Sequence, residues 1–336
     1  MNPTLIPSQL PDNLTGMQKS VLIDTDPGVD DALALLLALN SDKLQVKAIT
    51  TVCGNVDVQT ATANLQRVLQ QVSGPYPILA QGASQALSRE PFFAGHVHGA
   101  DGLGGTQSRQ EHTLGSSSTA PTLSARSAAE EILCQTANSP GPLSLITLGP
   151  LTNIALALQQ DPDLPSKIQE MIIMGGAYTV PGNITPAAEF NIYVDPEAAD
   201  LVFRSGINIT AVGLDVTRQV RVQRQELQHW VQAQDTHLRR SIQAWTRHSL
   251  DFMQDLTGEA SMPLHDPLAV LICMYPDLVK TAPMHVEVET KGEHTQGMTL
   301  ADLRPILGRW KKEPNIQVCT WVDSRQSLKL FWEEVA

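Results

Sequence analysis

The sequence is short of cysteine, and the cysteines that it has are far apart. Its 336 residues include four, at Cys53, Cys134, Cys273 and Cys319, and no two of them form a Cys-x-x-Cys pair. This spacing argues against a disulfide framework and fits reduced thiols with mostly structural roles. We therefore expect a cytoplasmic protein.

Long apolar runs and an excess of basic residues are also missing. No apolar stretch reaches the length of a membrane span, and the polar first segment lacks the charged and apolar regions of a signal peptide. The formal net charge is −12, because 35 acidic residues outnumber 23 basic ones. These features argue against a membrane protein and against a nucleic-acid binder. They also predict that residues 1–19 form a flexible polar tail.

Short apolar, β-branched runs alternate with helical patterns along the chain. Predicted strands at 20–26, 44–55, 143–150, 168–176 and 207–217 are interleaved with predicted helices at 31–40, 58–72, 151–161 and 195–206. This order is typical of an α/β fold with an open, mostly parallel sheet flanked by helices. No internal repeat or linker is evident, so we expect residues 20–336 to form one domain.

Two segments depart from this alternation. Residues 84–122 are rich in Gly, Ser, His and Gln, which predicts a long mobile connection. Such a connection is either a lid that closes over a binding site or an ordinary surface insertion. Residues 284–336 contain further predicted strands and end in a helical pattern.

The sequence VLIDTDPGVDDALALLLAL at 21–39 places four carboxylates between two apolar runs. Strand side chains alternate, so Asp24 and Asp26 should face the same side, while Asp30 and Asp31 open a helix. The helix dipole favours an acid by about 0.3–1 kcal/mol, too little to hold four partly buried carboxylates together. A bound divalent cation removes the repulsion, and oxygen ligands favour Ca²⁺ or Mg²⁺ over zinc.

Three alternatives to a bound cation compete for this acidic cluster. A solvated helix start suits Asp30 and Asp31 but not two acids on an apolar strand. An EF-hand loop fails, because it needs a preceding helix and a glycine at its sixth position, where this chain has Val29. A phosphoryl-transfer enzyme with an aspartate nucleophile at a strand tip stays open at this point.

Polar residues also follow the next predicted strands, at the edge where open α/β sheets bind ligands. Asn55 comes directly after a glycine, and on its own it fits an ordinary turn. Leu148 precedes Gly-Pro, where an irregular backbone frees a carbonyl as a metal ligand. Thr152 or Asn153 is the expected cap of the helix that follows.

Two later motifs add further donors and acceptors. Asn183, Glu189 and Asn191 suit a polyhydroxylated ligand, although isolated residues of these types usually lie on surfaces. His265 and Asp266 precede an apolar helical run. Asp266 is either a helix cap or a further cation ligand, and His265 is either a chance neighbour or a proton donor.

Together these motifs resemble those of the inosine-uridine preferring nucleoside hydrolases. DTDPGVDDALAL, GN, GPLTN, MGG, GNITPAAEFNIYVDPEAA and HDPLAV occur in the family's order, from about Ser20 to near the C-terminus. The resemblance implies the nucleoside hydrolase fold with its Rossmann-like core. It also implies hydrolysis of the N-glycosidic bond of purine or pyrimidine ribonucleosides to free base and ribose.

The resemblance further implies a single Ca²⁺ at the base of the pocket. Asp30 matches the general base that takes a proton from a Ca²⁺-bound water, and Asp24 matches an acid that orients neighbouring groups. Leu148 stands where many relatives have Thr, a tolerable change because the ligand there is a backbone oxygen. The implied metal ligands are Asp26, Asp31, Asp266 and the carbonyl of Leu148.

The residues that the resemblance assigns to the substrate lie in four motifs. His265 matches an acid that protonates the departing base, an effect typically worth about 10²–10⁴ in rate. His98 falls in the family's mobile loop and is expected to close over the substrate. The positions that match ribose contacts are Asn55, Met174, Asn183, Glu189 and Asn191.

Two other functions are weighed against this one. A non-catalytic nucleoside or ribose binder would keep the metal ligands but could dispense with Asp30, so the presence of Asp30 favours catalysis. A phosphoryl-transfer enzyme would need cationic groups near the acids, and none of the motifs above contains Lys or Arg. Base preference is left open, with base contacts expected from about 90–105 and 230–260. The resemblance implies a homodimer or homotetramer.

Overall fold

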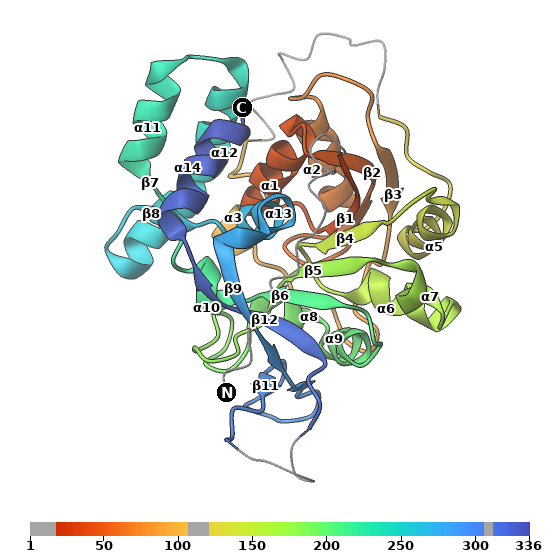
Figure 1. The fold of residues 1–336 in the computed structure, drawn as a ribbon. Coiled ribbons are helices and arrows are strands. Elements are labelled where there is room, and N and C mark those ends of the chain that lie inside the picture. The colour runs from red at the N-terminus through yellow and green to blue at the C-terminus, as the bar shows by residue number, and fades with distance from the viewer. Residues whose placement is uncertain (1–17, 107–120, 306–311) are drawn as a thin grey trace, which may run out of the picture.

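The computed structural model describes residues 18–106, 121–305 and 312–336 (Figure 1). Its centre is an eight-stranded sheet with the order β3-β2-β1-β4-β5-β6-β12-β9. All neighbours run parallel except β9, which is antiparallel to β12 at one edge. The predicted open, mostly parallel sheet is therefore confirmed. The strands are β1 (Lys19–Thr25), β2 (Leu44–Thr51), β3 (Ile78–Gln81), β4 (Ser144–Thr147), β5 (Glu170–Met174), β6 (Ile209–Val212), β9 (Val279–Met284) and β12 (Ile316–Val322).

Helices cover both faces of this sheet (Figure 1). One layer contains α1 (Val29–Asn40), α2 (Val58–Leu69), α13 (His265–Met274) and α14 (Ser324–Glu334). The opposite layer contains α5 (Ala128–Asn138), α6 (Thr152–Gln160), α7 (Leu164–Lys167) and α9 (Pro196–Phe203). Alternate residues of β1 divide between the two layers, because Val21 and Ile23 belong to one apolar cluster and Leu22 to the other.

Short elements surround one end of the sheet. Helices α11 (Arg224–Ala233) and α12 (His237–Thr257) lie between the strands of a small ladder, β7 (Arg221–Gln223) and β8 (Ser261–Pro263). A second ladder, β10 (Val286–Val288) with β11 (Thr299–Ala301), projects from the opposite end (Figure 1). The helices α3 (Gly95–His98), α8 (Phe190–Val194) and α10 (Leu214–Thr217) complete the surroundings of the site. No helix among the described residues is long and apolar enough to cross a membrane.

The expected boundaries of the tail and of the long connection change in detail. Lys19 already belongs to β1, where its N–H donates to the carbonyl of Lys43, so the ordered chain starts before residue 20. Residues 1–17 and 107–120 lie outside the described residues. Within the connection, residues 95–98 form α3, and a turn follows that packs on α12. Gly104 has a φ of +69°, and a Cβ there would lie 2.5 Å from the carbonyl oxygen of Trp245.

Candidate active site

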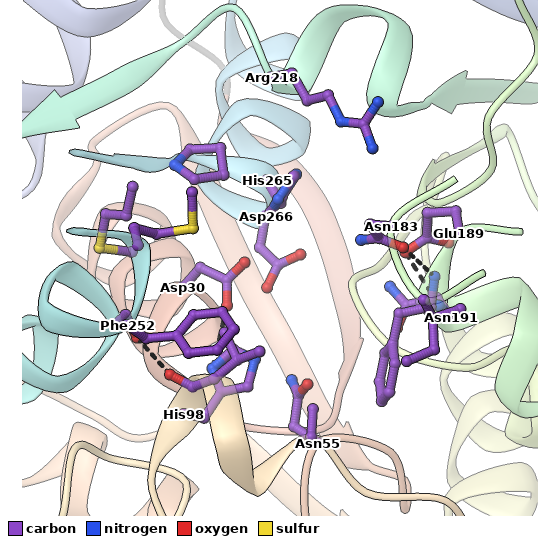
Figure 2. Close-up of a pocket in the computed structure, with 18 of the residues that line it drawn as sticks. Asp30, Asn55, His98, Asn183, Glu189, Asn191, Arg218, Phe252, His265 and Asp266 are labelled. Atoms are coloured by element: carbon purple, nitrogen blue, oxygen red, sulfur yellow. Dashed lines mark hydrogen bonds and ion pairs between the residues drawn. The ribbon is translucent and has the colours of Figure 1, made fainter. Parts of the chain in front are cut away.

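A cavity of about 510 Å³ opens beside the ends of β2, β4 and β5 (Figure 2). In the sheet, β1 lies between β2 and β4, which makes this the point where open α/β sheets bind ligands. Most of the predicted site residues line the cavity, whereas Asp24, Asp26 and Asp31 are fully buried beneath it. The predicted residues in the lining are Asp30, Asn55, His98, Leu148, Met174, Asn183, Glu189, Asn191, His265 and Asp266.

The acidic cluster forms where β1 passes into α1 and meets the start of α13. Carboxylate oxygens of Asp30, Asp31 and Asp266 all lie within 4.8 Å of one another. This set has Asp30 where the resemblance implies Asp26 as a ligand. Asp26 is nevertheless close, because the charges of Asp31 and Asp30 contribute to its raised pKa after burial. The division of roles between Asp26 and Asp30 therefore stays a prediction.

Hydrogen bonds fix Asp31 at the floor of the site. Its Oδ1 accepts from the hydroxyl of Thr25 at 2.5 Å, and its Oδ2 accepts from the Gly28 N–H and the Asn55 side-chain amide, each at 3.0 Å. The bond from Gly28 closes the first turn of α1, so the same acid starts the helix and faces the cluster. The sequence does not single out Thr25, because strand alternation alone points it away from the acids.

Asp26 is held between two turns. Its Oδ2 accepts from the Asn55 N–H at 2.6 Å, whereas its Oδ1 is buried without a hydrogen-bond partner among the described residues. A Cβ at Gly54 or Gly149 would lie 2.0 or 2.5 Å from an oxygen of this carboxylate. A buried carboxylate oxygen with no donor is costly, unless a cation completes its surroundings.

The electrostatics of the cluster point the same way. Burial raises the pKa of Asp30 to about 6, and it raises the pKa values of Asp31 and Asp266, which the neighbouring Asp30 charge raises further. Several carboxylates at this separation cannot all ionise without a positive charge between them. Oxygen donors of this kind suit a hard divalent cation, so the residues present fit the ion that the sequence predicts.

Asp24 lies one layer below the cluster. Its Oδ1 accepts from Thr50 Oγ1 at 2.5 Å and from Asn153 Nδ2 at 2.8 Å, and burial raises its pKa to about 7. The expectation that Thr152 or Asn153 caps α6 is wrong. The N-cap is Leu151 without a side-chain cap bond, and the Thr152 hydroxyl instead donates to Asp195.

The opposite wall of the cavity carries the predicted ribose contacts (Figure 2). Glu189 caps α8 by accepting from the N–H groups of Asn191 and Ile192, and it also accepts from the Gly176 N–H. The Asn191 amide donates to the carbonyls of Leu148 at 2.7 Å and Met174 at 3.1 Å. These bonds tie the wall to the ends of β4 and β5.

Two histidines border the cavity. Burial lowers the pKa of His98 to about 4 and that of His265 to about 3, so both rings are neutral near pH 7. The Val29 N–H donates to Nδ1 of His98 at 3.1 Å, which leaves the proton of this ring on Nε2. Nδ1 of His265 lies 2.8 Å from Thr217 Oγ1. The leaving-group role of His265 stays a prediction.

The remaining wall is apolar and comes from the regions expected to contact the base. Residues 94, 96 and 97 contribute from the first region, and α12 contributes Ser249, Phe252, Met253 and Leu256. The sequence does not single out these α12 residues, because their pattern is that of any amphipathic helix. Arg218 and Arg221 also line the cavity, where they donate to the main-chain carbonyls of Pro181, Gly182 and Ser261.

Comparison with known proteins agrees with this arrangement. The sequence profile of the family described as inosine-uridine preferring nucleoside hydrolase matches residues 21–329. The chain belongs to this family. The nucleoside hydrolase assignment made from the motifs is therefore confirmed, and the chain is a nucleoside hydrolase with the acidic cluster at the family's DTDPGVDD motif.

Individual relatives of this nucleoside hydrolase differ in the base named in their titles. The pyrimidine-specific ribonucleoside hydrolase RihA of Salmonella gallinarum is 38% identical over 324 residues, which cover 95% of this chain and 99% of RihA. Among solved structures, a plant nucleoside hydrolase, PpNRh1, superposes with a TM-score of 0.86 at 34% identity, covering 95% of this chain and 99% of the plant chain. A purine-preferring ribonucleoside hydrolase from Gardnerella vaginalis has a TM-score of 0.84 at 30% identity, covering 94% and 98%.

Proposed function

We propose that the protein is a Ca²⁺-dependent ribonucleoside N-ribohydrolase that releases free base and ribose. The single observation that carries this proposal is the buried acidic cluster, with its unpartnered Asp26 oxygen, at the floor of a cavity that has a polar and an apolar wall. A nucleoside has the same division, with a hydroxylated sugar and a flat base. The site thus matches the substrate in chemistry as well as in family.

The chain's own residues divide the work of hydrolysis. Asp26, Asp31, Asp266 and the Leu148 carbonyl would hold the cation, which when bound lowers the pKa of a water molecule. Asp30 lines the cavity, and its raised pKa of about 6 lets it take the proton from the attacking water. Glu189, Asn183 and Asn191 would orient the ribose while charge develops at its anomeric carbon.

The departing base needs a proton or a hydrogen bond. His265 lines the cavity between the acids and Arg218, and its ring is neutral near pH 7 (Figure 2). A neutral ring serves as a hydrogen-bond donor, and it becomes an acid only if the leaving base raises its pKa. His98 offers a second ring whose free proton is on Nε2.

The alternatives from the sequence find less support in the structure. A phosphoryl-transfer site needs free cationic groups, and the two arginines of the cavity are already bonded to main-chain carbonyls. A non-catalytic ribose binder has no use for Asp30 at the cavity surface. A homodimer or homotetramer, and a cytoplasmic location, stay predictions.

A substrate panel tests the proposal. The purified protein should release reducing sugar from inosine, adenosine, uridine and cytidine at different rates, with at least one clearly above the enzyme-free background. Thymidine, which lacks the 2′-hydroxyl, is the matched control and should be a poor substrate, because ribose hydroxyls complete the proposed cation shell. Release from none of the ribonucleosides, with Ca²⁺ supplied, would contradict the proposal.

A further inference from the structure

We propose that Asn153 is a positioning residue that sets the geometry of the cation site from behind the acidic cluster. This inference rests on the proposed function, because it concerns the cation that the cluster is proposed to bind. Asn153 does not line the cavity, and its side chain is 1% exposed. Any effect on the cation must therefore pass through its hydrogen-bonded neighbours.

The Asn153 amide joins three neighbouring strands. Its Nδ2 donates to Asp24 Oδ1 at 2.8 Å and to the Thr51 carbonyl at 3.0 Å, and its Oδ1 accepts from the Ala83 N–H at 2.9 Å. Asp24 lies in β1, Thr51 ends β2, and Ala83 follows β3. Because a carbonyl only accepts and an amide N–H only donates, these partners fix the orientation of the Asn153 side chain.

From these contacts the coupling reaches the proposed ligands by two short routes. The main-chain carbonyl of Asp24 accepts from the Leu148 N–H at 2.8 Å, so a shift of Asp24 moves the peptide that carries the Leu148 carbonyl. The Ala83 carbonyl accepts from the Cys53 N–H at 3.0 Å, which anchors the turn before Asn55. That turn holds Asp26 through the Asn55 N–H.

Asp26 therefore lies between two turns that both depend on Asn153. Gly54 is in one turn and Gly149 in the other, and both approach the Asp26 carboxylate too closely to accept a side chain. At this spacing a small displacement of either turn changes the position of the carboxylate. Residues that support metal ligands in this way typically change metal affinity by about 10- to 100-fold when they are mutated.

The test compares two buried asparagines that make the same kinds of bond. Asn315 is the matched control, because its Nδ2 donates to the carbonyls of Phe203 and Val286 and its Oδ1 accepts from the Val286 N–H, all away from the cluster. Ca²⁺ affinity of the full chain, freed of metal by chelation, is measured by titration calorimetry, together with the unfolding midpoint of each variant.

We expect Asn153→Ala to weaken Ca²⁺ binding by about 10- to 100-fold, while Asn315→Ala lowers the unfolding midpoint without changing the affinity. Asn153→Asp is the second variant. It keeps the acceptor for Ala83 and the size of the side chain, loses the donor to Asp24, and should also weaken binding.

Three results would count against the inference. If Asn153→Ala and Asn153→Asp bind Ca²⁺ like the wild type, Asn153 does not position the site. If affinity in Asn315→Ala falls as much as in the Asn153 variants, the effect is general destabilisation. If the wild type itself binds no Ca²⁺, the proposed function fails at its metal, and the inference fails with it.

Discussion

Asp26 has the environment that is hardest to explain without a cation. It is fully buried, one of its oxygens has no donor among the described residues, and its pKa is raised well above the ordinary range by burial and by its acidic neighbours. Asp30 differs, because it reaches the cavity surface. The two residues should therefore respond differently to the same substitution.

Asp30→Asn should lower kcat by about 10²–10⁴ while the protein keeps its Ca²⁺. An amide cannot accept the proton of the attacking water, but it keeps the size of the side chain. Asp26→Asn is the matched variant and should lose the metal, measured by elemental analysis of the purified protein. Equal activity of Asp30→Asn and wild type would refute the assigned base, and loss of metal in Asp30→Asn would make Asp30 a ligand.

His265→Ala should reduce the hydrolysis of natural nucleosides by about 10²-fold or more, because their bases leave poorly without a proton. A ribose derivative with a nitrophenol leaving group needs no proton and should be hydrolysed at nearly the wild-type rate. The measurement is kcat/KM on both substrates. A uniform loss across both would show that His265 supports the site in some other way.

At the scale of the elements, the apolar wall of the cavity depends on one face of α12. Phe252, Met253 and Leu256 extend from this helix into the lining, and His96 packs edge-on against Phe252 with ring centroids 5.8 Å apart. Bases stack on aromatic rings with free energies of about 1–3 kcal/mol. We therefore assign to α12 the wall against which the base packs.

Phe252→Ala should raise KM for inosine by about 10-fold or more, because the stacking surface is lost, while inhibition by free ribose is unchanged. Phe93→Ala is the control, since Phe93 is 43% exposed and does not line the cavity. Steady-state kinetics on both variants provide the comparison. An equal loss of affinity for ribose and for inosine would show that the mutation disturbs the whole pocket.

The sequence predicts the elements around β1 and α1 well, because an apolar strand, a Pro-Gly turn and a leucine-rich helix each carry a strong local pattern. It predicts α5, α11 and α12 poorly, since their amphipathic patterns do not show what they face. The contacts of Thr25 and Asn153 are also missed. Both depend on the order of β3, β2 and β1 in the sheet, which no local pattern contains.

At the scale of the whole molecule, the cluster makes stability depend on pH and on the cation. The folded-state pKa values of Asp24 and Asp30 are about 7 and about 6, above the unfolded value near 3.9. Without a cation the folded protein binds more protons than the unfolded chain between these values. Stability from these groups is therefore fully present below about pH 4 and is lost as pH rises through about 6 to 7.

The unfolding midpoint of the metal-free protein should therefore fall between about pH 5 and about pH 8, relative to that of the Ca²⁺-saturated protein. The cation favours the ionised carboxylates, so saturation removes most of this loss. Thermal unfolding of both forms across this range measures the gap. A gap that is constant or narrows as pH rises would mean that these acids are not where the cation binds.

The most direct measurement follows bound calcium and activity together in one preparation. Chelation should remove about one Ca²⁺ per chain and abolish nucleoside hydrolysis, and added Ca²⁺ should restore both in parallel. Active protein that contains no bound divalent cation and is indifferent to the chelator would contradict the proposed mechanism.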